Sequence, residues 1–110
     1  MTENNECMTV LLCGVGGQGT ILAADILARV AAHEGLDVKI SEIHGMAQRG
    51  GSVSTVVRLG DKVHAPLTSF GYADRIVAFE ATEALRYLPF LAPEGTMLVN
   101  SEIITPTRNI

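Results

Sequence analysis

The sequence has little charge, few aromatic residues and no long apolar run. Charged residues make up 18% of the 110 residues and hydrophobic residues 47%, which excludes an intrinsically disordered chain. The eight Lys and Arg residues are scattered singly and the formal net charge is −4, so there is no basic patch for a nucleic-acid backbone. No apolar stretch approaches the ~18 residues of a membrane-spanning helix. We therefore expect neither a nucleic-acid nor a membrane partner.

Cysteine is also scarce, with Cys7 in the polar N-terminal tail and Cys13 inside an apolar run. Neither has a Cys or His nearby at the spacing of metal ligands, so we expect reduced thiols, no metal site and no disulfide framework. The first residues, MTENNECM, lack the basic start and apolar stretch of a signal peptide. The sequence therefore predicts a cytoplasmic protein with a single domain over residues 1–110.

The order of apolar segments predicts an α/β fold. The continuous apolar run at 8–13 predicts a strand buried on both faces, and an alanine-rich helix is expected over 18–34, ending at Gly35. The alternating segment 38–43 predicts a second strand. As in a βαβ unit, the two strands should pair in parallel.

The next segments predict a hairpin added to this unit. A strand with one wetter face is expected over 52–59, followed by a turn at 60–61 and a short return strand over 62–67. The run at 75–79 predicts another buried strand. We expect Glu80, at the end of that strand, to be a solvated carboxylate.

Towards the C-terminus, Thr82 is expected to cap a short helix over 83–88, before a turn at 93–95 and a last strand over 96–100. Together the elements predict a Rossmann-like three-layer sandwich whose mostly parallel sheet has an added hairpin. Such a fold usually continues with another helix and strand. We therefore expect the chain to be truncated at its C-terminus or to be a domain that a partner completes.

The segment GVGGQG at 14–19 satisfies G-x-G-x-x-G between the first predicted strand and the helix. Glycines let the backbone turn tightly and approach a ligand, and a helix N-terminus offers unpaired N–H groups. The same turn also occurs without a ligand, where it only packs the helix on the strand. The candidate ligand-binding residues of this loop are Gly14, Gly16, Gly17, Gln18 and Gly19.

Binding of NAD needs a second feature, an acidic residue about 20 residues further on that contacts the ribose. Glu42 is near enough, but it lies inside the alternating strand, and Asp37 comes too early. A Walker-type phosphate loop is excluded because Gly19 is followed by Thr20 with no lysine between them. The sequence therefore has the glycine loop of a dinucleotide site but no acidic residue in the expected place.

A second loop, HGMAQRGG at 44–51, follows the second predicted strand at the same carboxyl edge of the sheet. Arg49 is a planar cation suited to phosphate or carboxylate, and His44 and Gln48 can both donate and accept hydrogen bonds. A polar surface loop is the alternative, but this concentration of groups favours contact with a ligand or a partner. The candidate residues are His44, Gly45, Met46, Gln48, Arg49, Gly50 and Gly51.

Four segments, in this order, resemble the gamma-type domain of 2-oxoacid:ferredoxin oxidoreductases. They are CGVGGQGTILAADILA, SEIHGMAQRGGSVSTVVRLG, ADRIVAFEATEALRYLP and GTMLVN. Within that family the chain is most similar to the beta-type small subunits of the indolepyruvate enzymes. GVGGQG alone would be a weak signature, whereas its combination with HGMAQRGG is specific.

The resemblance implies an accessory subunit of an enzyme of the EC 1.2.7 type. Family members oxidatively decarboxylate a 2-oxoacid with thiamine diphosphate, pass electrons through iron–sulfur clusters to ferredoxin and form acyl-CoA and CO2. In the indolepyruvate type, thiamine diphosphate and the clusters belong to a large alpha subunit. The absence of cysteine clusters here agrees with that division. The resemblance thus implies a non-catalytic chain that binds no cofactor itself, is inactive alone and has CoA at a site shared with its partner.

Two other functions stay open at this point. One is a free-standing NAD-binding domain, and the other is a ligand-free structural domain that forms a homodimer. No Ser-His-Asp order or paired carboxylate site is visible, so we expect no catalytic residue in this chain.

Overall fold

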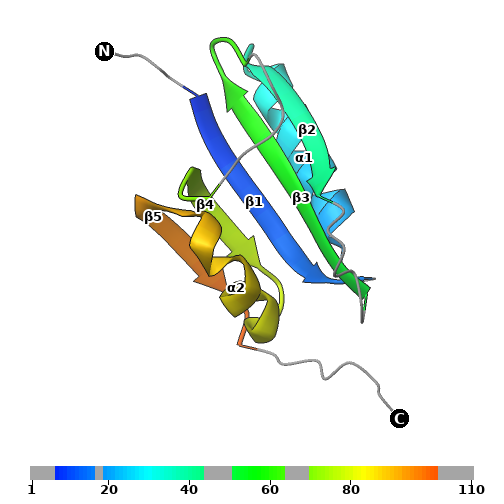
Figure 1. The fold of residues 1–110 in the computed structure, drawn as a ribbon. Coiled ribbons are helices and arrows are strands. Elements are labelled where there is room, and N and C mark those ends of the chain that lie inside the picture. Colours follow the sequence, from blue (N-terminus) through cyan, green and yellow to red (C-terminus); the bar gives the residue numbers. More distant parts are fainter. Residues whose placement is uncertain (1–6, 17–18, 44–50, 64–69, 102–110) are drawn as a thin grey trace.

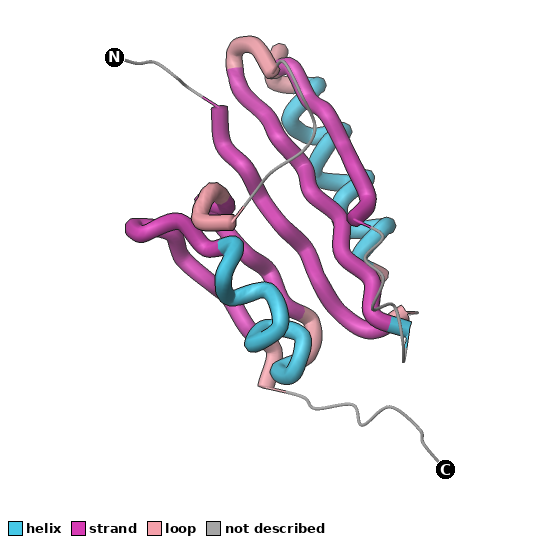
Figure 2. Tube along the Cα trace, in the orientation of Figure 1, coloured by secondary structure: helices cyan, strands magenta, loops and turns pink. Residues whose placement is uncertain are grey.

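Five strands form one sheet in the computed structural model, which describes residues 7–16, 19–43, 51–63 and 70–101. Helix α1 lies on one face and helix α2 on the other, so the predicted three-layer α/β architecture is confirmed (Figures 1 and 2). The strands are β1 (Cys7–Val15), β2 (Asp37–Ile43), β3 (Ser52–Gly60), β4 (Ala73–Ala78) and β5 (Leu91–Val99). The helices are α1 (Thr20–His33), α2 (Ala81–Tyr87) and the 3-10 helix η3 (Leu88–Phe90).

The strand order is β2-β3-β1-β4-β5. β1, β4 and β5 run parallel to one another, while β3 is antiparallel to both β1 and β2. The predicted parallel pairing of the first two strands is therefore wrong, because β3 lies between them. Its segment Ser54–Val57 is almost fully buried, so its small polar side chains mark a central strand and not a wet face.

The hairpin that the sequence predicts after residue 59 is also different. β3 pairs with β2, the strand before it, and not with a return strand. Lys62 and Val63 belong to no strand, and residues 64–67 lie outside the described part of the chain. Val63 donates its backbone N–H to Asp37 Oδ2 at 2.9 Å, so this amide bonds a side chain in place of a neighbouring strand.

Each helix covers its own part of the sheet. α1 packs over β1, β2 and β3, where Val10, Leu12, Ala24 and Val57 form one buried cluster. α2 packs over β1, β4 and β5, where a second cluster is centred on Leu11, Ile76 and other buried side chains. α1 ends as predicted, since Gly35 has a φ of +87° in the left-handed region that glycine favours.

The last strand begins earlier than the sequence predicts. Residues 93–95, expected as a turn, lie inside β5. A step of two residues along β4, from Ala73 to Arg75, is matched by a step of five residues along β5, from Leu91 to Thr96. The extra residues form an irregularity at which Gly95 approaches the β4 backbone closely.

None of the described helices combines the length and the apolar character that crossing a membrane would need.

Candidate functional site

The two glycine-rich loops meet at one corner of the sheet. Because β1 and β3 are antiparallel, the end of β1 lies beside the start of β3, and Val15 pairs with Ser52. The backbone N–H of Gly16 donates to the carbonyl oxygen of Gly51 at 2.5 Å. Val15, Gly16, Gly51 and Ser52 together form what we call the corner.

Glycine is needed on both sides of this contact for different reasons. A Cβ on Gly16 would lie 3.2 Å from the carbonyl oxygen of Gly51, which is tighter than ordinary van der Waals contact. Gly51 has a φ of +79°, a left-handed conformation that costs L side chains about 1–2 kcal/mol. The glycines of the two loops therefore permit a close approach of backbone to backbone.

Helix α1 begins beside the corner. Gly19, with a φ of +88°, forms its N-cap and accepts a hydrogen bond from the Ala23 backbone N–H at 2.8 Å. A hollow of about 310 Å³ lies there, lined by Gly19, Thr20, Ile21 and Val53. Within the described residues, no side chain accepts a hydrogen bond from the first backbone N–H groups of this helix.

The structure thus brings together some of the residues predicted as a binding site. Gly14 lies in β1 opposite Val53, Gly16 bonds Gly51, and Gly19 forms the N-cap of α1. The remaining candidates lie outside the described residues, and their predicted role stays a prediction: Gly17, Gln18, His44, Gly45, Met46, Gln48, Arg49 and Gly50.

The corner adjoins the point where the chain switches direction across the sheet. From β1 the chain passes through α1 to β2 on one side, whereas β4 pairs with β1 on the other side. At the carboxyl ends of these two strands, Phe79 donates its backbone N–H to the Cys13 carbonyl at 2.8 Å. In open α/β sheets this switch point is where ligands bind.

Glu80 follows β4 at this edge and is not solvated as the sequence analysis predicted. It is completely buried, and its side chain caps α2 by accepting the Glu83 backbone N–H at 2.8 Å. Thr82, the predicted cap, lies inside the helix. The acidic pair three residues apart in EATE resembles the spacing of a capping box, a signal that could have located this cap.

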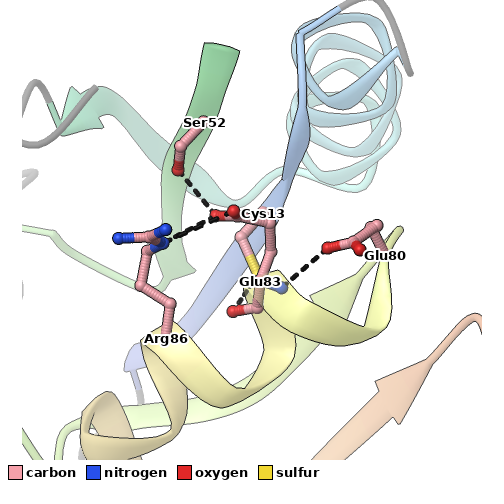
Figure 3. Close-up of polar contacts among 5 residues, drawn as sticks. All are labelled: Cys13, Ser52, Glu80, Glu83 and Arg86. Atoms are coloured by element: carbon pink, nitrogen blue, oxygen red, sulfur yellow. Dashed lines mark hydrogen bonds and ion pairs between the residues drawn. The ribbon is translucent and has the colours of Figure 1, made fainter. Parts of the chain in front are cut away.

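Glu83 is the centre of a polar cluster between α2 and the sheet (Figure 3). Ser52 Oγ donates to Glu83 Oε1 at 2.6 Å. Arg86 Nε lies 3.3 Å from Oε1 and 3.4 Å from Oε2 of the same carboxylate. The Glu83 side chain is 7% exposed, whereas that of Arg86 is 44% exposed and reaches the surface.

The thiol of Cys13 lies against the same helix turn, with Sγ 3.7 Å from the Glu83 carbonyl oxygen (Figure 3). Burial, together with the charges of Glu83 and Glu80, raises the pKa of this thiol to about 12. Cys13 therefore stays protonated at neutral pH, where a thiol is a poor nucleophile. Cys7 is half-buried, and both cysteines are free.

The position of Glu42 departs from the dinucleotide-binding arrangement. β3 lies between β1 and β2, which puts Glu42 two strand spacings, about 9–10 Å, from the strand that leads into the glycine loop. In a Rossmann site the acidic residue ends the strand directly beside the first. The described residues also contain no group of three or more His, Cys, Asp or Glu that could hold a metal ion.

Two apolar surfaces lie away from the corner. The first is a hollow of about 360 Å³ on β4 and β5, lined by Val77, Phe79, Leu98 and their neighbours, with Leu98 68% exposed. The second is an aromatic cluster in which the Phe70 and Phe90 rings lie 4.8 Å apart and the Tyr87 and Phe90 rings 5.7 Å apart. Phe70 is 69% exposed. Exposed apolar surface of this kind is typical of protein interfaces.

Residues 9–110 match the family described as pyruvate ferredoxin/flavodoxin oxidoreductase. The chain belongs to this family. It is 46% identical over 97 residues to indolepyruvate oxidoreductase subunit IorB of Methanothermobacter thermautotrophicus, covering 88% of this chain and 49% of that protein. The resemblance found in the two loops is thereby confirmed, and the chain spans about half the length of the curated relatives it matches.

Two solved structures share the fold. The gamma subunit of a keto/oxoacid ferredoxin oxidoreductase from Geobacter sulfurreducens PCA superposes with a TM-score of 0.71 at 29% identity, covering 86% of this chain and 51% of that one. A 2-oxoglutarate:ferredoxin oxidoreductase from Magnetococcus marinus gives a TM-score of 0.75 at 20% identity, covering 94% of this chain and 18% of that one. The chain therefore shares its fold with that gamma subunit and with part of the second, much longer chain.

Proposed function

We propose that this chain is the accessory small subunit of an indolepyruvate-type 2-oxoacid:ferredoxin oxidoreductase, in which it binds a large alpha subunit. The 46% identity to an IorB subunit supports the indolepyruvate type. Thiamine diphosphate and iron–sulfur clusters, both on the large subunit, supply decarboxylation and electron transfer to ferredoxin, and the products are acyl-CoA and CO2. This chain supplies binding surface and no catalytic residue.

The residues of this chain do not fit a resident iron–sulfur cluster. A cluster takes four cysteine ligands, and the sequence contains two cysteines. One of them, Cys13, is held as a thiol by burial, because burial raises its pKa to about 12. These observations support the assignment of the redox centres to the partner subunit.

The meeting of the two loops is the observation on which the proposal rests. The Gly16–Gly51 hydrogen bond joins the two segments whose sequences define the family resemblance. It does so at the carboxyl edge where β1 and β4 meet, beside the start of α1. We infer that this edge takes the phosphate groups of CoA, because the first N–H groups of α1 and the Arg49 guanidinium both suit anions.

The exposed apolar surfaces support a subunit role. Leu98 on β5 and Phe70 beside η3 are more than two-thirds exposed, and each belongs to a group of neighbouring apolar side chains of the kind found at interfaces. We propose that the large alpha subunit covers at least the hollow lined by Leu98 and Val77.

Co-expression with a large subunit from the same genome tests the proposal. The pair is expected to purify together and to reduce ferredoxin with indolepyruvate and CoA, whereas this chain alone is expected to show no turnover.

The variant Arg49→Ala tests the second loop. It should raise the KM for CoA by about tenfold, because it removes a charge-assisted hydrogen bond. Arg29→Ala is the matched control, because Arg29 is exposed on α1 and pairs only with Asp25, at 2.9 Å, in the described contacts.

Each result decides one part of the proposal. Turnover by the isolated chain would overturn the accessory role. Unchanged kinetics and assembly in Arg49→Ala would remove the second loop from the site. Tight NAD binding by the isolated chain, lost in Glu42→Ala, would favour the dinucleotide-binding alternative, and a stable homodimer without any ligand effect would favour a structural domain.

A further inference from the structure

We propose that Glu83 is a positioning residue that holds the corner in place from the opposite face of the sheet. The proposal rests on the proposed function in one respect, namely that the corner is the surface used in the complex. Glu83 lies on α2, whereas the corner leads into α1 on the other face.

Glu83 hydrogen-bonds the corner directly, through Ser52. Its Oε1 accepts the Ser52 hydroxyl at 2.6 Å. Ser52 is the first residue of β3, pairs with Val15 and directly follows Gly51, whose carbonyl accepts the Gly16 N–H. A displacement of Ser52 therefore moves the Gly51 carbonyl, and with it the contact between the loops.

Glu83 is itself held at three other points. Its backbone N–H bonds Glu80 Oε1 at 2.8 Å, and its carbonyl lies 3.7 Å from Cys13 Sγ. Its carboxylate also pairs with Arg86 (Figure 3). The first two contacts fix the backbone of Glu83 and the third fixes its buried carboxylate, so the residue can define the position of Ser52.

Burying a carboxylate at this position costs free energy that an apolar side chain would not cost. Glu83 is 5% exposed as a residue, and burial of a charge is costly unless it is paired and hydrogen-bonded. An apolar side chain would fill the same space against the cluster of Leu11 and Ile76 without this cost. The polar group is explained if it is needed to hold a hydroxyl at a defined point of the corner.

Hydrogen exchange of the Gly16 amide in the full chain measures directly how often the hydrogen bond between Gly16 and Gly51 opens. Ser52→Ala and Glu83→Ala are each expected to speed Gly16 exchange by about tenfold or more, because the bond to Gly51 opens more often. The double variant should be no faster than the faster single variant, since both changes break one path. Glu83→Gln keeps an oxygen that accepts the Ser52 hydroxyl and should exchange within about threefold of the wild type.

Two controls separate positioning from general stability. Ile76→Val lowers stability in the same core without touching the polar cluster, and Gly16 exchange should stay at the wild-type rate. Glu94→Gln changes an exposed carboxylate on β5 and should have no effect. If Glu83→Ala does not fold, Ser52→Ala decides alone. Unchanged Gly16 exchange in folded Ser52→Ala would overturn the positioning role.

The assembled complex then tests the link to function. Ser52→Ala should raise the KM for CoA or the dissociation constant for the large subunit by about tenfold, with a smaller change in kcat. Glu83→Gln should restore most of the affinity that Glu83→Ala loses. Faster Gly16 exchange with wild-type affinity for both partners would overturn the functional role of the corner, while the positioning by Glu83 would stand.

Discussion

The backbone N–H of Gly16 and the carbonyl oxygen of Gly51 form a hydrogen bond of 2.5 Å between residues 35 positions apart. This bond exists because β3 is inserted between β1 and β2 and runs antiparallel to both. In an uninterrupted βαβ unit the strand beside β1 would be β2, whose carboxyl end, not the start of β3, would lie beside the glycine loop. The inserted strand thus brings the start of β3 beside the glycine-rich loop that follows β1.

Gly51→Ala is expected to weaken both the fold and the complex. An alanine at a φ of +79° costs about 1–2 kcal/mol in unfolding free energy, measured by urea denaturation. Gly35→Ala is the matched control, since Gly35 has a φ of +87° and open space around it, far from the corner along the chain. Both variants should lose similar stability, but only Gly51→Ala should lose affinity for the large subunit. Equal affinities would contradict a role for the corner.

Gly95→Ala should be more damaging to the fold. A Cβ at this position would lie 2.8 Å from Leu91 Cδ1, 2.9 Å from the Ala73 carbonyl oxygen and 3.0 Å from that of Asp74. Two of these contacts are backbone and cannot move without opening the β4–β5 pairing. We expect a loss of about 2–4 kcal/mol, while Glu94→Ala, at an exposed neighbour, should change stability by no more than about 0.5 kcal/mol. A loss under 1 kcal/mol for Gly95→Ala would show that β5 shifts freely.

The fold class could be predicted from the sequence, because apolar runs and glycine stops locate β1, α1, β3 and β4 to within a few residues. The position of β3 could not, because Ser54 and Thr55 have the polarity of a wet face although they are buried in a central strand. Pairing order depends on long-range contacts that no local pattern encodes. For the same reason the two loops could be singled out, but not their contact.

The polar cluster behind the corner was missed for a related reason. Glu80 and Glu83 look like surface carboxylates in the sequence, since most acidic residues are exposed. Their burial follows from two distant partners: Ser52 bonds Glu83, and the β1 strand containing Cys13 covers the same helix turn. Only the spacing of the acidic pair in EATE offered a local signal.

Cys13 should be far less reactive than Cys7 in the folded chain. Burial raises the pKa of the Cys13 thiol to about 12, so its thiolate is scarce at pH 8, and the surrounding core blocks access as well. Labelling with iodoacetamide followed by mass spectrometry should modify Cys7 first, and Cys13 only after urea is added. Labelling of both at equal rates without denaturant would contradict the burial.

The same thiol predicts a loss of stability in alkali. Above its ordinary value of 9.0 the thiol loses its proton in the unfolded chain but keeps it in the folded chain, so folding becomes less favourable. The loss should grow between pH 9 and about 12. Cys13→Ala removes this contribution, so the stability of the variant relative to the wild type should rise across the interval. A constant difference between the two proteins would contradict the shift.

The lowered pKa of Asp37 leads us to expect a loss of stability in acid, in contrast to the loss in alkali expected from Cys13. The pKa of Asp37 is lowered from 3.8, first by the backbone N–H of Val63, then by the side chain of Lys39. A carboxylate with a lowered pKa stabilises the fold above its ordinary value, and this contribution is lost as the pH falls through the lowered value. Asp37→Asn should therefore reduce the midpoint of thermal unfolding at pH 7, and the difference from wild type should disappear as the pH is taken below 3.8. Asp61→Asn, at an exposed residue of the turn after β3, is the matched control for the loss of one acidic surface charge. If Asp37→Asn differs from wild type equally at pH 7 and in strong acid, the Val63 amide does not depend on the charge of Asp37.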